Sequence, residues 1–196
     1  MICMARLPSV LGTDDFSIAE LCAARIDGDL FAVAEAWAPI DEPDVAAFRA
    51  LAVAHSAPRD LIVERMSAAW VHGACMAPPR RAQFCVPTDA RISAISDPGI
   101  VVREVRIDEA EVVLLGPVRC TSLVRTTFDL LRDATLEDLA SIDVVAMLLA
   151  EHRGLEAAAR LRLDAAARVP FKARASARLD RASDACRRGV PGLSRR

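Results

Sequence analysis

Three side chains in the middle of the chain are of types that bind zinc. His72 and Cys75 form a His-x-x-Cys pair, and Cys85 follows further along. Imidazole nitrogen and thiolate sulfur are ligands that suit zinc. A lone pair of this kind is a weak signal, and the 6 cysteines of the chain include no Cys-x-x-Cys. We therefore interpret His72 as a histidine at a helix end and the thiols as reduced core residues, and we predict no metal.

A run of carboxylates, Asp108-Glu109-Ala110-Glu111, could hold a cation or serve a nuclease. It has no accompanying lysine and lies between two expected strands, so we interpret it as a solvated turn. The chain also lacks the phosphate-binding loop, the dinucleotide fingerprint, the nucleophile elbow and the His-Glu-x-x-His pair of common enzymes. We predict no catalytic residue and no cofactor; an enzyme that gathers His72, Cys75 and acidic groups in one pocket is the least favoured alternative.

The arginines near the C-terminus form a third group. Arg174, Arg178 and Arg181 are spaced so that they share one face of an expected helix, and Arg188 follows in the same helix. Such a face suits contacts with nucleic-acid phosphates. With Arg25 in a short helix near the N-terminus, these arginines are our candidates for DNA contact, and a simply solvated helix face is the alternative.

Charge is distributed unevenly. The first 60 residues carry 4 basic and 10 acidic groups, residues 61–150 carry 9 and 12, and residues 151–196 carry 12 and 5, which gives the net charge of −2. Hydrophobic residues make up 53%, a value inflated by alanine, and no apolar run approaches the ~20 residues that cross a bilayer. The N-terminal stretch is too broken for a secretory signal. We expect a cytoplasmic protein with no membrane partner.

The first part of the chain indicates a small winged-helix-like unit. Ser17 and Glu20 fit a capping box at the start of a helix, which should continue to about Arg25. Asp27-Gly28 ends this helix, and residues 30–40 are typical of one or two short strands. An amphipathic helix should follow from Pro43.

The remainder alternates short strands with helices. We expect a strand in residues 60–65 and then a short helix that Ser67 caps and Gly73 ends. Ser122 should cap a helix that carries Arg125 and Asp129 one turn apart. Further strands are expected in 83–87, 99–107 and 111–116, and further helices in 136–152 and, in two pieces broken at Val169-Pro170, after residue 155.

These elements predict an α+β fold with a short, reduced winged-helix-like unit, a small mixed sheet flanked by helices, and a helical C-terminus. The expected boundaries give a unit of residues 1–42, a main domain of 43–150 and a basic, helical segment of 151–196.

Four stretches in this order resemble the AbiEi-type antitoxin family, in the compact actinobacterial form without a restriction-endonuclease-like C-terminal domain. They are AELCAARIDGDLFAVAEAWAPID; MSAAWVHGA; GIVVREVRIDEAEVVLLGPVRCTS; and SLVRTTFDLLR. The second matches the family's Ser-x-x-x-x-His-Gly helix, and the fourth its Arg-Thr-x-x-Asp helix. The residues that carry these two motifs are Ser67, His72, Gly73, Arg125, Thr126 and Asp129.

The resemblance implies a non-enzymatic component of a type IV toxin–antitoxin system, a transcriptional regulator that represses its own operon through a DNA-binding winged helix. It also implies operator DNA as a partner, and a nucleotidyltransferase-like toxin that is neutralised without a stable complex; a homodimer is a further expectation. Within this resemblance Arg125 and Asp129 are a fold signature, an exposed pair worth ~0.3–0.5 kcal/mol, or more if partly buried.

The chain departs from the family in its N-terminal unit, which has one clear helix and an acidic balance. The alternative function is therefore a protein-interaction module, derived from an antitoxin–nuclease architecture, that neither binds DNA nor catalyses a reaction.

Overall fold

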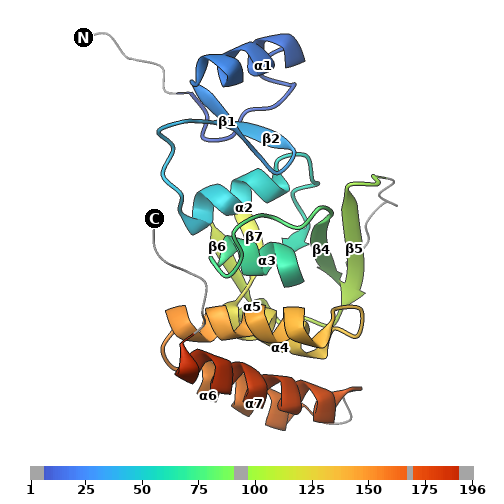
Figure 1. Cartoon of the computed structure of the whole chain (residues 1–196). Helices are drawn as coiled ribbons and strands as arrows, with labels where there is room; N and C mark the ends of the chain where they lie inside the picture. Colours follow the sequence, from blue (N-terminus) through green and yellow to red (C-terminus); the bar gives the residue numbers. More distant parts are fainter. Residues whose placement is uncertain (1–6, 91–96, 167–169, 190–196) are drawn as a thin grey trace, which may run out of the picture.

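The computed structural model describes residues 7–90, 97–166 and 170–189. Its elements form three tiers, which are the N-terminal unit, a five-stranded mixed sheet with two helices, and a layer of four helices (Figure 1). This arrangement confirms the α+β fold expected from the sequence. Within the described ranges, none of the helices combines the length and the apolar character needed to cross a membrane.

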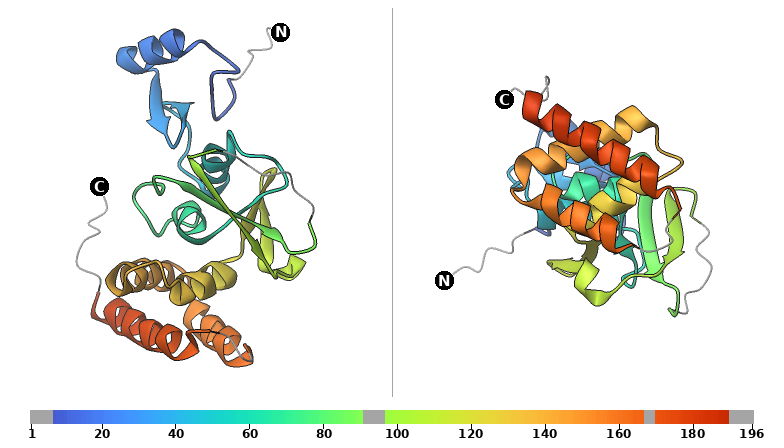
Figure 2. Two further views of the ribbon diagram at one scale, coloured as in Figure 1. Left: turned by 90° about the vertical axis from the view of Figure 1, so that its right-hand side faces the viewer. Right: turned by 90° about the horizontal axis from the view of Figure 1, so that it is seen from below.

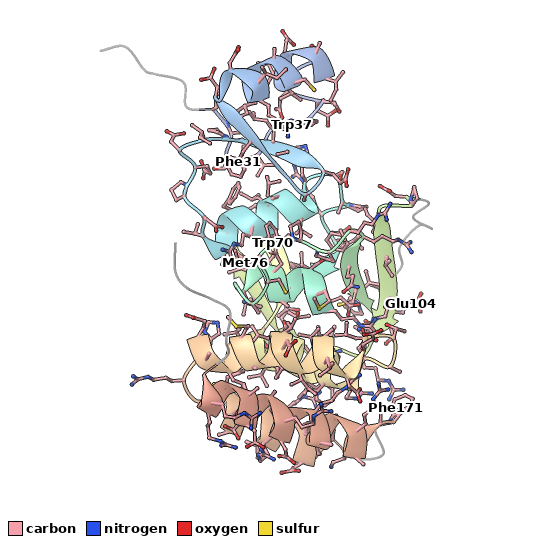
Figure 3. The ribbon with its side chains drawn as sticks, viewed as in Figure 1. Phe31, Trp37, Trp70, Met76, Glu104 and Phe171 are labelled. Carbon is pink, nitrogen blue, oxygen red and sulfur yellow. The ribbon has the colours of Figure 1, made fainter. Side chains whose placement is uncertain are left out.

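The N-terminal unit contains helix α1 (Ile18–Asp27) and a hairpin of strands β1 (Leu30–Val33) and β2 (Ala36–Pro39). The predicted capping box is confirmed, because Ser17 and Glu20 satisfy each other's backbone N–H groups. Trp37 pairs with Leu11 in a β-bridge and packs on the small core of Leu11, Leu21 and Leu30 (Figure 3). One helix and a hairpin constitute the reduced winged-helix-like unit.

The hairpin contacts the second tier through an aromatic pair. Phe31 of β1 lies toward α2 (Ala46–Ala54), and its ring centroid is 6.1 Å from that of Phe48 (Figure 3). Phe48 is buried, whereas Val45, the N-cap residue of α2, is exposed.

The sheet of the second tier has the strand order β5-β4-β3-β7-β6, in which β4 with β5 and β3 with β7 run parallel and the other neighbours run antiparallel. Helices α2 and α3 share its core, which includes Val63, Trp70 and Phe84. The strands and helix α3 of this tier have the following bounds: β3 Ile62–Val63, α3 Arg65–Val71, β4 Ala82–Pro87, β5 Ile100–Val105, β6 Val112–Leu115 and β7 Val118–Thr121.

The third tier consists of α4 (Leu123–Arg132), α5 (Asp138–Glu151), α6 (Leu155–Ala165) and α7 (Lys172–Arg188). Figure 2 shows these helices gathered on one side of the sheet domain. They share one hydrophobic core, and α4 joins it to the second tier by packing on α3. Residue 150, the expected end of the main domain, lies in α5, and the core of this tier includes residues on both sides of it.

Candidate functional site

Helix α4 carries the Arg-Thr-x-x-Asp signature on its buried face. Ser122 accepts a hydrogen bond from the backbone N–H of Arg125, so the predicted cap is confirmed. Arg125 and Asp129 are 5% and 6% exposed, and Arg125 Nε donates to Asp129 Oδ2 over 2.8 Å. The expectation of an exposed surface pair is therefore wrong. Thr126 Oγ1 lies 2.7 Å from Thr121 Oγ1 at the end of β7, so this residue connects α4 to the sheet.

The Arg125 guanidinium also joins segments that are far apart in the sequence. Its Nη1 donates to the backbone carbonyl of Arg106 over 3.0 Å and to Glu111 Oε2 over 2.5 Å. The other oxygen of Glu111 accepts from Arg162 Nε of α6 over 2.9 Å. The carboxylate of Glu111, in the short 3₁₀ turn before β6, thus bridges α4 and α6. The prediction of a solvated turn holds for Asp108 and Glu109, which are exposed, but not for Glu111.

The environment of Glu111 predicts a dependence of stability on pH. Burial alone would raise the pKa of Glu111, but the guanidinium groups of Arg125 and Arg162 lower it below its ordinary 4.5. Below about pH 4.5 the unfolded chain takes up a proton that the folded chain resists, so the free energy of unfolding should fall as the pH drops. Urea unfolding between about pH 6 and about pH 3 measures this loss. Glu111→Gln should show a shallower decline, and an equal decline in that variant would contradict the assignment.

A second buried ion pair lies beside the first. Glu64, which is 1% exposed, directly follows β3 and accepts two hydrogen bonds from Arg103 of β5 over 2.6 and 2.5 Å. Arg65 next to it lies 3.2 Å from Asp133, just after α4. These contacts fix β5 and α4 around the first residues of α3. Sequence reasoning missed this pair; a glutamate at the end of an apolar run was the available signal.

The residues of the Ser-x-x-x-x-His-Gly motif orient α3. Ser67 is buried inside the helix and accepts a hydrogen bond from the N–H of Gln83 on β4 over 2.9 Å, so the prediction that it caps the helix is wrong. The N-cap residue is Glu64. His72 Nε2 donates to the carbonyl of Thr121 on β7 over 2.8 Å, and Gly73 ends the helix at φ 90°. The motif thus places α3 against two strands.

The residues considered for zinc are used elsewhere. The Nε2 atom of His72 is taken by Thr121, and burial lowers the pKa of its imidazole. Burial raises the pKa of the Cys75 thiol to about 11, and it also raises that of Cys85, so both are inert thiols at neutral pH. In the ranges that the structure describes, no cluster of three histidine, cysteine, aspartate or glutamate side chains is placed to hold a metal ion.

The arginines predicted for DNA contact divide into two groups. Arg178 is 2% exposed and donates to the carbonyls of Leu131 in α4 and of Asp133 and Leu136 in the segment that follows it. Arg174 donates to Asp138 over 3.0 and 2.7 Å. Arg178 therefore does not belong to an exposed basic face, because α7 packs it against α4 and α5, whereas the Arg174 side chain is 39% exposed and paired with Asp138.

The other predicted arginines remain available to a partner. Arg25 on α1 and Arg181 and Arg188 on α7 are exposed, and within the described ranges they make no hydrogen bond or ion pair through their side chains. Asp180 and Asp184 are also exposed on α7, so the surface around Arg181 is of mixed charge.

No protein-family model and no curated protein matches the chain. Among solved structures, the crystal structure of the RV2827C protein from Mycobacterium tuberculosis is similar, with a TM-score of 0.45 and 14% sequence identity. The similarity covers 95% of this chain and 78% of that chain.

Proposed function

We propose that this chain is a non-catalytic, AbiEi-type antitoxin-like transcriptional regulator of a type IV toxin–antitoxin system, acting in the cytoplasm on operator DNA. The observation that supports DNA contact is the exposure of Arg25, Arg181 and Arg188 without a hydrogen-bonded or ion-pair partner in the described ranges. The motif residues Arg125 and Asp129 are buried and stabilise the fold, so they are not the contact surface in this proposal.

An arginine without an acidic partner can contact a phosphate without breaking an existing ion pair. Arg160, in contrast, pairs with both Asp180 and Glu156, and it would have to give up these carboxylates to bind a phosphate. The N-terminal unit is strongly acidic, and Arg25 is the only basic residue in its described part. DNA contact in this proposal is therefore centred on α7, and its two unpaired arginines, Arg181 and Arg188, imply a modest salt dependence.

The test is binding of the purified protein to its own upstream DNA and to a scrambled duplex at two salt concentrations. We expect preference for its own DNA, and we expect the double variant Arg181→Gln, Arg188→Gln to bind more weakly. If both arginines contact phosphates, the slope of log K against log salt should become shallower by about 2 in this variant.

The matched control is the double variant Arg160→Gln, Arg187→Gln. It removes the same two charges from the same layer, but at arginines that already have acidic partners. A similar loss in both double variants would indicate only general charge attraction, and no binding of either duplex would refute the DNA function.

A second candidate function is a protein-interaction module, and the surface of the N-terminal unit favours it. Large apolar side chains are exposed there beside the acidic groups, and Ile18 and Ile26 of α1 are 55% and 85% exposed. Such a surface suits contact with another protein, including a second copy of the chain or the nucleotidyltransferase-like toxin. Absence of DNA binding together with a dimer that an Ile26→Glu change dissociates would favour this function over the first.

A further inference from the structure

An open cavity of about 390 Å³ lies where β5, α4 and α6 meet, outside the surfaces assigned above to DNA or protein partners. Figure 3 labels Glu104 on β5, near the place where this strand approaches the helical layer. Glu104 itself does not line the cavity, since successive side chains of a strand point to opposite faces. The charged groups that do line it are Arg103, Arg106, Arg125, Arg132, Arg162 and Asp129.

The arginines of this cavity outnumber the carboxylates that contact them. Arg125 is paired with Asp129 and with Glu111, Arg162 shares Glu111, and Arg103 is paired with Glu64. Five guanidinium groups thus meet three carboxylates, which leaves two positive charges uncompensated.

Arg106 and Arg132 are the two arginines in excess, because neither forms an ion pair within the described ranges. The Arg132 guanidinium carbon lies 4.7 Å from the centre of the Phe128 ring, and that of Arg162 lies 4.3 Å from the same centre. The Nε of Arg132 is buried without a hydrogen-bond partner in the described structure. An unpaired buried donor is costly, and an anion beside the guanidinium would offset part of that cost by charge attraction.

The electrostatics of Arg132 agree with this geometry. Burial lowers the pKa of Arg132, and the neighbouring cations Arg125, Arg162 and Arg103 lower it further, against the opposing effect of Asp129. Cations are therefore held close together at this point of the fold. An anion in the cavity would relieve their repulsion.

We infer that this cavity binds a phosphate group through Arg106 and Arg132. The planar guanidinium fork matches the oxygens of phosphate, and its hydrogen bonds to an anion are among the strongest in proteins. A cavity of about 390 Å³ is larger than one phosphate needs, so it also admits part of the molecule that carries the phosphate. That molecule is a phosphorylated small molecule or a nucleic-acid strand.

The bound anion would connect two tiers of the fold. Arg106 follows β5 in the sheet domain, whereas Arg132 ends α4 in the helical layer. A phosphate held by both would therefore stabilise the packing of the layer on the sheet, and the melting temperature should rise with phosphate concentration.

The first test uses inorganic phosphate as the probe, with chloride at equal ionic strength as the reference, in calorimetric titration and thermal melting. We expect saturable binding by the unmodified chain. In the double variant Arg106→Gln, Arg132→Gln, we expect the affinity for phosphate to fall by a factor of about ten or more. Phosphate also stabilises proteins non-specifically, so only the difference between the unmodified chain and the variant is interpreted. Arg106→Gln alone, at an exposed and unpaired position, provides the same comparison if the double variant does not fold.

Two further probes distinguish the sources of the phosphate, a mononucleotide monophosphate and an oligonucleotide without terminal phosphates. Binding of the mononucleotide alone would indicate a small phosphorylated ligand, and binding of the oligonucleotide that is lost in the double variant would indicate a nucleic-acid strand. The control Arg181→Gln, Arg188→Gln should keep phosphate binding, which separates this site from the proposed operator contact. The inference is overturned if phosphate does not bind, or if it binds equally to the folded Arg106 and Arg132 variants.

Discussion

Replacement of Arg178 by alanine should lower the free energy of unfolding by about 3–5 kcal/mol, a large fraction of the total for a domain of this size. The Arg178 side chain is 2% exposed, and its guanidinium donates over 3.0, 2.8 and 2.6 Å to the carbonyls of Leu131, Asp133 and Leu136. These carbonyls lie at and just after the end of α4, where the helix supplies no N–H donors to pair with its last carbonyl oxygens. Alanine would leave them unpaired beside a cavity.

Chemical denaturation of the purified variants measures this effect. Arg181→Ala is the matched control, because Arg181 lies one turn along α7, is exposed and has no ion-pair partner in the described ranges. It should change the free energy of unfolding by no more than about 0.5 kcal/mol. Equal effects of the two changes would show that the buried capping contacts of Arg178 contribute little.

The features that the sequence predicted well are those with local causes. Ser17 and Glu20 close their capping box within four residues, and Ser122 caps α4 within the same distance. The runs expected as strands in residues 83–87, 99–107 and 111–116 are rich in apolar and β-branched residues and are separated by turns, and the structure has strands β4, β5 and β6 there. Such signals depend on neighbours along the chain, so they are visible without knowledge of the tertiary structure.

The features that the sequence did not predict depend on long-range packing. The spacing of Arg174, Arg178 and Arg181 correctly indicates one helix face, but only the docking of α7 on α4 and α5 decides how much of it is buried. In the same way β3 is shorter than expected, because Glu64 is already the N-cap residue of α3, and its carboxylate pairs with Arg103, 39 positions further along. Neither partner is recognisable from periodicity.

The candidate site lies between these two cases. The four-residue spacing of Arg125 and Asp129 predicted their pairing, and they do pair. Their burial was not predictable, because it requires two distant residues. Glu111 lies 14 positions from Arg125, and Arg162 lies 51 positions from Glu111. The arginine cavity has the same origin, since β5, α4 and α6 bring its cations together only in the folded chain.

The buried pair of Arg125 and Asp129 gives the second large effect. Arg125→Met should lower the free energy of unfolding by about 3–5 kcal/mol, because it leaves the Asp129 carboxylate unpaired at 6% exposure. Asp129→Leu should also lower the free energy of unfolding, but by somewhat less, because Glu111 still pairs with Arg125 in that variant.

The double variant Arg125→Met, Asp129→Leu tests whether the ion pair itself stabilises the fold, or whether the fold is destabilised only when one charge is removed and the other stays buried. Removal of both charges leaves no buried charge at these positions, so the double variant should be more stable than the sum of the single losses implies, with a coupling energy of about 1–3 kcal/mol. Denaturation of the four proteins completes the cycle. Additive losses would mean that Arg125 acts mainly through Glu111 and the Arg106 carbonyl, which join α4 to α6 and to the segment after β5. In that event the signature helix would be held by its bridging contacts rather than by its own ion pair.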